Sequence, residues 1–267
     1  MPEARLDKIL SVTRERVAAL QGKARELERR ALAAPAPRPL AAALAGATVG
    51  VVAEVKRRSP SAGAIREDLD PVEHARAYAR GGAVALSVLT DEAHFGGSLD
   101  DLARVAREVT VPVLRKDFIL DELQLLEARA AGASAVLLIV RALDDARLRL
   151  LARAACGLGL GVLVEVHSEG ELVRALETDP TAVGVNSRDL ATFEVDLAVA
   201  ERLVGQVPPH VPAVAESGIE TRADVERLAA AGADVVLVGT SVARSGRPEA
   251  AVRALVGVAR KRRERRA

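Results

Sequence analysis

The sequence of 267 residues is short of several residue types, and each shortage excludes a class of protein. Its single cysteine, Cys156, cannot form a disulfide within the chain, and its four histidines lack the spacing of a zinc site. No window of about 20 apolar residues is free of charge, and the N-terminus has no basic-then-apolar signal segment. We therefore expect a soluble, cytoplasmic protein without a metal site and without a membrane partner.

An excess of charge of one sign is also absent, since 38 Lys and Arg balance 37 Asp and Glu. With 49% hydrophobic residues, this balance excludes a disordered chain and a basic coat for nucleic acid. The basic cluster RKRRERR at 260–266 stands apart, and we interpret it as a solvated tail at the end of a helix, where cations are favoured. No nucleic-acid partner is expected. The sequence does not reveal an oligomeric state, and a monomer is our working expectation.

Lysine and asparagine are scarce. Only 5 of the 38 cationic residues are lysine, and between residues 34 and 250 the chain keeps just Lys56 and Lys116. Asn186 is its only asparagine. Because arginine is too basic to give up a proton at neutral pH, the retained lysines are candidates for chemistry that arginine cannot perform. The alternative is that they survive by chance or form surface salt bridges.

The first part of the chain predicts a helical extension. Apolar residues between Leu6 and Leu27 recur at spacings of three and four, which is the stripe of an amphipathic helix. Three prolines at 35, 37 and 39 then interrupt the pattern and indicate a linker. We assign residues 1–48 to this extension and linker, and residues 49–267 to the domain that follows.

Eight short runs rich in valine and leucine follow, separated by charged helical stretches. Continuous apolar runs of this length are expected for strands covered on both faces, as in a parallel sheet. Helix-end glycines at 82, 132 and 232 lie 50 and 100 residues apart, which fits repeats of 25 residues. We predict an α/β protein, a (β/α)8 TIM barrel with an N-terminal helical extension, and a doubly wound open sheet is the alternative. The runs are residues 49–55, 83–89, 111–116, 134–140, 161–166, 181–186, 211–217 and 234–239.

Ionisable side chains collect where these runs end. In such a barrel, functional residues come from the C-terminal ends of the strands and the loops that follow. Glu54 and Lys56 are two residues apart on the first run, so they point to the same side. Glu165 lies between two valines and is expected to point inward, which is costly without a partner such as Lys56 or Lys116. These groups predict acid–base chemistry, although Glu54 alone fits a structural carboxylate equally well.

The seventh and eighth runs end in turns of small residues. Ser217 and Gly218 follow the seventh, and Gly239 and Thr240 follow the eighth. Exposed backbone N–H groups, a hydroxyl and a helix N-terminus together bind phosphate, and in this fold the loops after strands seven and eight are its usual place. The turns therefore predict a phosphate site. Two ordinary tight turns are the plainer alternative.

Seven segments occur in order along the chain: AEVKRRSPSAG, LTDEAHFGGS, VLRKDFI, LVEVH, GVNSRDL, AESGI and VGTSV. Taken together, they resemble the indole-3-glycerol phosphate synthase family of tryptophan biosynthesis. The resemblance covers nearly all of the chain, and it implies a carbon–carbon lyase without a metal or organic cofactor. Enzymes of this family convert a phosphosugar, 1-(2-carboxyphenylamino)-1-deoxyribulose 5-phosphate, into indole-3-glycerol phosphate, CO2 and water.

The resemblance also implies roles for single residues. Lys116 would be the general acid at the substrate ketone, and Lys56 would contact the substrate and act as an acid in the dehydration. Glu165 and Glu54 would be candidate bases, oriented by Asn186. The other implied positions are Ser59 and Arg188 at the anthranilate carboxylate, Phe95 and Phe118 at the aromatic ring, Glu216 as a further substrate contact, and Ser217, Gly218, Gly239 and Thr240 at the phosphate.

Two other functions remain open at this point. One is another phosphosugar barrel, such as phosphoribosylanthranilate isomerase or the tryptophan synthase α subunit, and the second is a non-catalytic regulatory barrel that binds a phosphosugar. The lysines at 56 and 116 favour the synthase. We also expect the N-terminal extension to close the substrate pocket partly, so that deletion of residues 1–33 raises the Michaelis constant.

Overall fold

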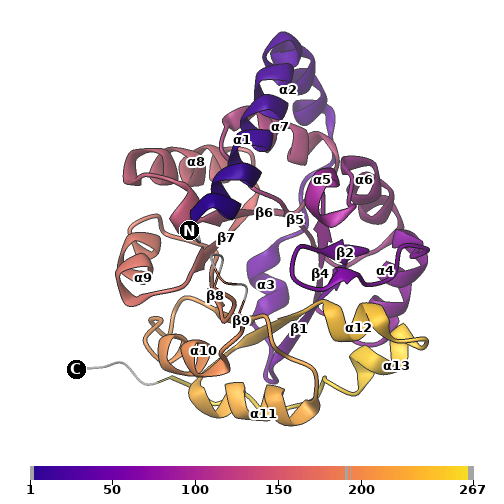
Figure 1. Cartoon of the computed structure of the whole chain (residues 1–267), viewed down its shortest axis with the longest axis vertical. Helices are drawn as coiled ribbons and strands as arrows, with labels where there is room; N and C mark the ends of the chain where they lie inside the picture. Colours follow the sequence, from indigo (N-terminus) through magenta and orange to yellow (C-terminus); the bar gives the residue numbers. More distant parts are fainter. Residues whose placement is uncertain (1–2, 190–191, 193, 264–267) are drawn as a thin grey trace.

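In a computed structural model, which describes residues 3–189, 192 and 194–263, eight parallel strands close into a barrel (Figure 1). Closure occurs where β1 pairs with β10, with Val52 opposite Leu237, and each of the eight predicted runs contains one of these strands. The predicted barrel is confirmed, and the open sheet is excluded. The strands are β1 (Gly50–Val55), β4 (Ala85–Leu89), β5 (Val113–Lys116), β6 (Ala135–Ile139), β7 (Gly161–Val166), β8 (Ala182–Asn186), β9 (Ala213–Glu216) and β10 (Val235–Val238).

Helices connect the strands and cover the outside of the barrel (Figure 1). Several begin at an Asp, Ser or Thr whose side chain accepts N–H groups of the first turn; Asp70 accepts those of Val72 and Glu73 at 2.9 and 2.8 Å. None of the described helices is long and apolar enough to cross a membrane. They are α4 (Pro71–Arg80), α5 (Glu92–Phe95), α6 (Leu99–Glu108), α7 (Glu122–Ala130), α8 (Asp145–Gly157), α9 (Glu169–Leu176), α10 (Leu197–Val204), α11 (Arg222–Ala231), α12 (Thr240–Arg244) and α13 (Pro248–Arg253).

Two short elements lie in loops of the barrel. A hairpin of β2 (Arg58–Ser59) and β3 (Gly63–Ala64) follows β1, and a 3-10 turn, η2 (Val140–Ala142), follows β6.

Both faces of the strands are buried, which explains the continuous apolar runs. On β1, Val51 belongs to the cluster that packs under the helices, whereas Val52 belongs to the inner cluster that fills the barrel. Leu114, Leu137 and Leu163 belong to that inner cluster as well. The barrel is therefore a packed core, and only its ends remain for binding.

The N-terminal extension consists of α1 (Glu3–Leu20), a 3-10 turn η1 (Gln21–Lys23), α2 (Ala24–Ala33) and α3 (Leu40–Leu44). The continuous stripe over 6–27 had suggested one helix; the break at η1 falls on Gly22, a residue that destabilises helix interiors. In Figure 1, α1 and α2 lie beside α7. The helix α3 was not expected after the prolines. Leu40 and Leu44 on α3 are buried in the inner cluster, and a Cβ at Gly161, where β7 begins, would lie 3.2 Å from Leu40 Cβ, so α3 plugs the N-terminal end of the barrel.

The basic C-terminal segment differs from its interpretation as a solvated tail. Its arginines do not end a helix, because α13 stops at Arg253. Arg260 and Arg263 both contact Asp234, whose exposed fraction is 2%, and Arg263 Nη2 lies 2.6 Å from Asp234 Oδ2. Ala259 forms an isolated antiparallel bridge with Thr48, just before β1. Residues 264–266 of the basic cluster lie outside the described residues. The part that is described is attached to the barrel.

Candidate active site

A cavity of about 500 Å³ lies at the C-terminal ends of the strands. Its lining includes all fourteen residues that the sequence predicted for the site. Most come from strand ends or the loops directly after them, as expected for inward positions of a barrel. The predicted residues that meet there are Glu54, Lys56, Ser59, Phe95, Lys116, Phe118, Glu165, Asn186, Arg188, Glu216, Ser217, Gly218, Gly239 and Thr240.

Lys116, at the end of β5, is the centre of one group of charges. Its Nζ lies 3.2 Å from Glu165 Oε2 and 3.7 Å from Glu216 Oε2. Asn186 Nδ2 donates a hydrogen bond of 3.1 Å to Glu165 Oε1. Glu165 and Glu216 are almost fully buried, and for Glu165 these contacts offset the cost of burying its charge. Of the two lysines expected as partners for Glu165, the contact is with Lys116.

Lys56 and Glu54 form a second pair on β1 and the residue after it. Lys56 Nζ lies 2.7 Å from Glu54 Oε1, and Ser87 Oγ donates to Glu54 Oε2 at 3.3 Å. Gly239 allows this arrangement, because a Cβ there would lie 2.5 Å from Glu54 Oε1 and 2.8 Å from Lys56 Nζ. The two-residue spacing of Glu54 and Lys56 therefore does place both side chains on the same side of the strand.

The pKa values of these groups are displaced in different directions. Burial opposes the charged form of Lys116, but Glu165, Glu216 and Glu54 outweigh it and raise its pKa. Burial likewise opposes ionisation of Glu165 and Glu54, yet nearby cations lower the pKa of each. The largest lowering effect comes from Lys116 for Glu165 and from Lys56 for Glu54. Burial, followed by the charge of Glu165, raises the pKa of Glu216 to about 8. Of these four groups at neutral pH, Lys116 is an ammonium, Glu165 and Glu54 are carboxylates, and Glu216 is a carboxylic acid.

The side chain of Glu216 fits in the barrel because residue 184, on the neighbouring strand β8, is a glycine and has no side chain. A Cβ at position 184 would lie 2.1 Å from Glu216 Oε1. That oxygen is buried and has no hydrogen-bond partner in the described structure. Glu216 also lines the cavity, so its protonated carboxyl can bind a polar group of a ligand there.

The two predicted phosphate turns follow neighbouring strands, β9 and β10, and both line the cavity. Ser217 and Gly218 both have positive φ, 66° and 76°, and a Cβ at Gly218 would approach Val195 Cγ1 to 2.6 Å. Thr240 begins α12, and Arg244 on that helix also lines the cavity. Sequence reasoning missed Arg244, although its i, i+4 spacing from Thr240 was an available signal.

Phe95, on α5, and Phe118, after β5, form an apolar wall with ring centroids 6.5 Å apart. Behind it, Ile9 and Leu10 of α1 belong to the same apolar cluster as Phe118. The expectation that the extension closes the pocket is not met directly, because no described residue of 3–48 lines the cavity. The extension supports the wall from outside.

The sequence places His167 near the loop side of the barrel, where it could line the mouth of the site, and the structure puts it beside Glu165 rather than in the cavity lining. Its Nε2 lies 3.5 Å from Glu165 Oε1, and its Nδ1 lies 3.2 Å from Glu171 Oε2. The signal for this contact was the two-residue spacing from Glu165, which puts both residues on one side of β7.

The closed barrel and this cavity define a TIM-barrel protein with paired lysines and carboxylates at the site, the equipment of an acid–base enzyme. The family model for indole-3-glycerol phosphate synthase matches residues 6–255. Indole-3-glycerol phosphate synthase of Mycolicibacterium smegmatis is 49% identical over 253 residues, 94% of this chain and 93% of the relative. That of Opitutus terrae is 47% identical over 261 residues, 94% of this chain and 98% of the relative. The chain belongs to the indole-3-glycerol phosphate synthase family.

Solved structures of lower identity share the fold. A 3-hexulose-6-phosphate synthase superposes with a TM-score of 0.59 at 21% identity, over 78% of this chain and 98% of that one. A thiamine phosphate pyrophosphorylase from Pyrococcus furiosus gives 0.57 at 20% identity, over 78% and 93%. These similarities concern the barrel alone.

Proposed function

We propose that this chain converts 1-(2-carboxyphenylamino)-1-deoxyribulose 5-phosphate into indole-3-glycerol phosphate, CO2 and water, with Lys116 as the general acid of ring closure. The observation that carries the proposal is the pair of lysine–glutamate contacts, Lys116 with Glu165 and Lys56 with Glu54, facing one cavity. Family membership supports the reaction, and the residue roles rest on this geometry.

Ring closure requires a proton donor at the substrate ketone. Attack of the aromatic carbon on the ketone builds negative charge on its oxygen, which the Lys116 ammonium stabilises and then protonates. Arg188 and Ser59 bind the anthranilate carboxylate, and Phe95 and Phe118 contact the ring. Loss of that carboxylate as CO2 restores the aromaticity of the ring.

Dehydration requires one acid and one base. Lys56 protonates the departing hydroxyl, and Glu165 or Glu54 accepts the proton from the carbon next to the nitrogen, with Asn186 orienting Glu165. Because a carboxylate leaves as neutral CO2, each turnover consumes one proton. Glu216, whose pKa is raised to about 8, is a substrate contact that still carries a proton at neutral pH.

The phosphate binds at the turns after β9 and β10. Ser217 and Gly218 supply one turn, and Gly239 and Thr240 supply the other. Backbone N–H groups in such turns favour an anion, and Arg244 adds a positive charge at the cavity wall.

The test is a pair of substitutions at Lys116. Lys116→Met removes the charge, whereas Lys116→Arg keeps it but cannot donate a proton at neutral pH. We expect both to reduce kcat by about 10²–10⁴-fold, measured by indole fluorescence, with the affinity for glycerol 3-phosphate largely kept. Retained turnover in either variant would refute the role of Lys116, and an unmodified protein that binds phosphosugar without turnover would indicate a regulatory barrel.

A further inference from the structure

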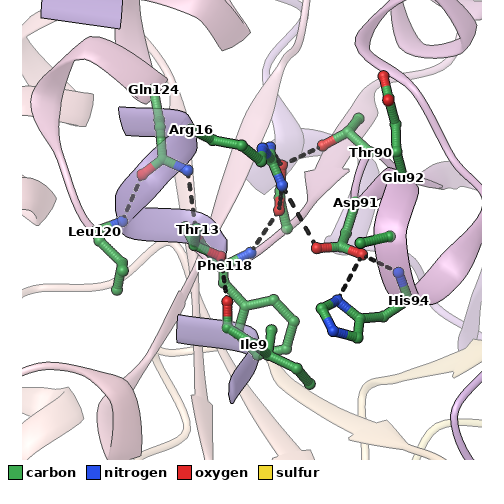
Figure 2. A network of polar contacts seen from close by, with 12 residues as sticks. Ile9, Thr13, Arg16, Thr90, Asp91, Glu92, His94, Phe118, Leu120 and Gln124 are labelled. Carbon is green, nitrogen blue, oxygen red and sulfur yellow. Dashed lines mark hydrogen bonds and ion pairs between the residues drawn. The ribbon is translucent and has the colours of Figure 1, made fainter. Parts of the chain in front are cut away.

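Arg16, on α1 of the N-terminal extension, reaches two buried carboxylates that belong to the cavity lining (Figure 2). Its Nη2 lies 2.8 Å from Asp117 Oδ2, and its Nη1 lies 3.4 Å from Asp91 Oδ2. The side chain of Arg16 is 33% exposed, whereas those of Asp117 and Asp91 are 0% and 1% exposed. One guanidinium of the extension thus bridges two acids that follow different strands, β5 and β4.

Asp117 fixes by hydrogen bonding the backbone that links Lys116 to Phe118 of the apolar wall. Its Oδ1 accepts the N–H of Phe118 at 2.8 Å, and its Oδ2 accepts the hydroxyl of Thr90 at 2.6 Å. Arg115 Nη2 donates to the same carboxylate at 3.0 Å. Burial opposes ionisation of Asp117, but Arg115 and Arg16 outweigh it and lower its pKa. Asp117 is therefore a fixed anion that orients the turn carrying Phe118.

Asp91 holds the start of the short helix that carries Phe95, the other ring of the apolar wall. It is the N-cap of α5, and its Oδ1 accepts the N–H of His94 at 2.6 Å and contacts His94 Nδ1 at 3.1 Å. Phe95 is the last residue of this short helix. The position of Phe95 thus depends on Asp91, as the position of Phe118 depends on Asp117.

We propose that Arg16 is a positioning residue that sets the spacing of Phe95 and Phe118, so that the N-terminal extension determines how well the aromatic half of the substrate binds. The inference rests on the proposed function, since it assumes a substrate with an aromatic ring. Two buried carboxylates repel each other unless a cation lies between them, and Arg16 supplies that cation. Ile9 and Leu10, on the same helix, belong with Phe118 to the inner apolar cluster. The phosphate turns lie on β9 and β10 and have no such contact with Arg16 among the described residues.

The experiment separates the two halves of the substrate. Binding of 2-aminobenzoate and of glycerol 3-phosphate is measured by calorimetry for Arg16→Met, Arg16→Lys and Arg14→Met, the last being an exposed arginine on the same helix. We expect Arg16→Met to weaken 2-aminobenzoate about tenfold, as the loss of one charged hydrogen bond would, and to leave glycerol 3-phosphate within about twofold. Arg16→Lys should recover part of the loss, and Arg14→Met should change neither.

Steady-state kinetics give a second measurement. KM for the full substrate should rise about tenfold in Arg16→Met, and kcat should fall less. Asp91→Asn removes the charge of one of the two carboxylates that Arg16 contacts, and it should likewise weaken binding of 2-aminobenzoate more than binding of glycerol 3-phosphate. This variant replaces Arg16→Met if Arg16→Met does not fold. Equal weakening of both fragments, or of neither, would overturn the inference. If the unmodified protein bound neither fragment and made no indole product, the proposed function would fail first.

Discussion

Arg263→Met tests the attachment of the C-terminal segment to the barrel. The substitution removes a side chain that is 6% exposed and whose Nη2 lies 2.6 Å from Asp234 Oδ2. Removal of one partner from a buried ion pair costs about 3–5 kcal/mol, because a buried charge loses its compensation. Asp234 still has Arg260 and the Ala213 N–H at 2.8 Å, which places the cost at the lower end.

Arg263 also donates to the backbone carbonyls of Val207 at 3.0 Å and Val211 at 2.8 Å, and to that of Gly232. Water can replace part of these bonds at the edge of the barrel. We therefore expect the free energy of unfolding to fall by about 3 kcal/mol, which is a large share of the total for a typical protein.

The assay is urea unfolding followed by circular dichroism at neutral pH. Arg262→Met, at an exposed neighbouring position, is the matched control and should change stability by less than about 0.5 kcal/mol. In a double-mutant cycle, Asp234→Asn should cost less in the Arg263→Met background than in the unmodified protein. If Arg263→Met behaved like the control, the segment would be the solvated tail that its composition suggested, and the reasoning would be wrong.

Three further predictions concern the site. Because the pKa of Glu216 is raised to about 8, the folded protein keeps a proton that the unfolded chain releases near pH 4.5, and this residue's contribution to stability falls as pH rises from about 5 to 8. In urea unfolding, Glu216→Gln should therefore gain stability relative to the unmodified protein over that range. A stability difference that does not change with pH would contradict this expectation. Gly184→Ala should displace Glu216 and lower kcat about tenfold or more, whereas Gly170→Ala, where nothing lies within 4 Å of the added carbon, should not; equal kcat values in the two variants would count against the role of Glu216. Deletion of residues 1–33 removes Ile9, Leu10 and Arg16 from the wall and should raise KM, and unchanged kinetics in a folded truncation would show that the wall does not need this support.

The strands were predictable from sequence because burial on both faces leaves a continuous apolar run. The extension was harder. The stripe over 6–27 correctly indicated helix, but it did not show the break at Gly22. The plug formed by Leu40 and Leu44 was missed, because five residues of LAAAL have no periodicity that separates a buried helix from a linker.

In the site, residues fixed by strand geometry were predictable. Alternation placed Glu54 with Lys56, and the cost of an inward carboxylate indicated a lysine partner for Glu165. Contacts that depend on how two distant elements pack were not predictable. Arg16 lies 101 residues before Asp117, and no local pattern links them. The same holds for Arg263 and Asp234, whose attraction appears only once the barrel has closed.

The bridge between Thr48 and Ala259 brings together the two ends of the barrel part of the chain. Without the extension, residue 48 and residue 259 could therefore be joined by a short loop, and the chain could be opened at another loop at the N-terminal end of the barrel. Every strand would keep its neighbours, including the pairing of Val52 with Leu237 that closes the ring. The strands would then follow one another in a new order along the chain while keeping the same order around the cavity. We expect such a circularly permuted barrel to bring the same lysines and glutamates together.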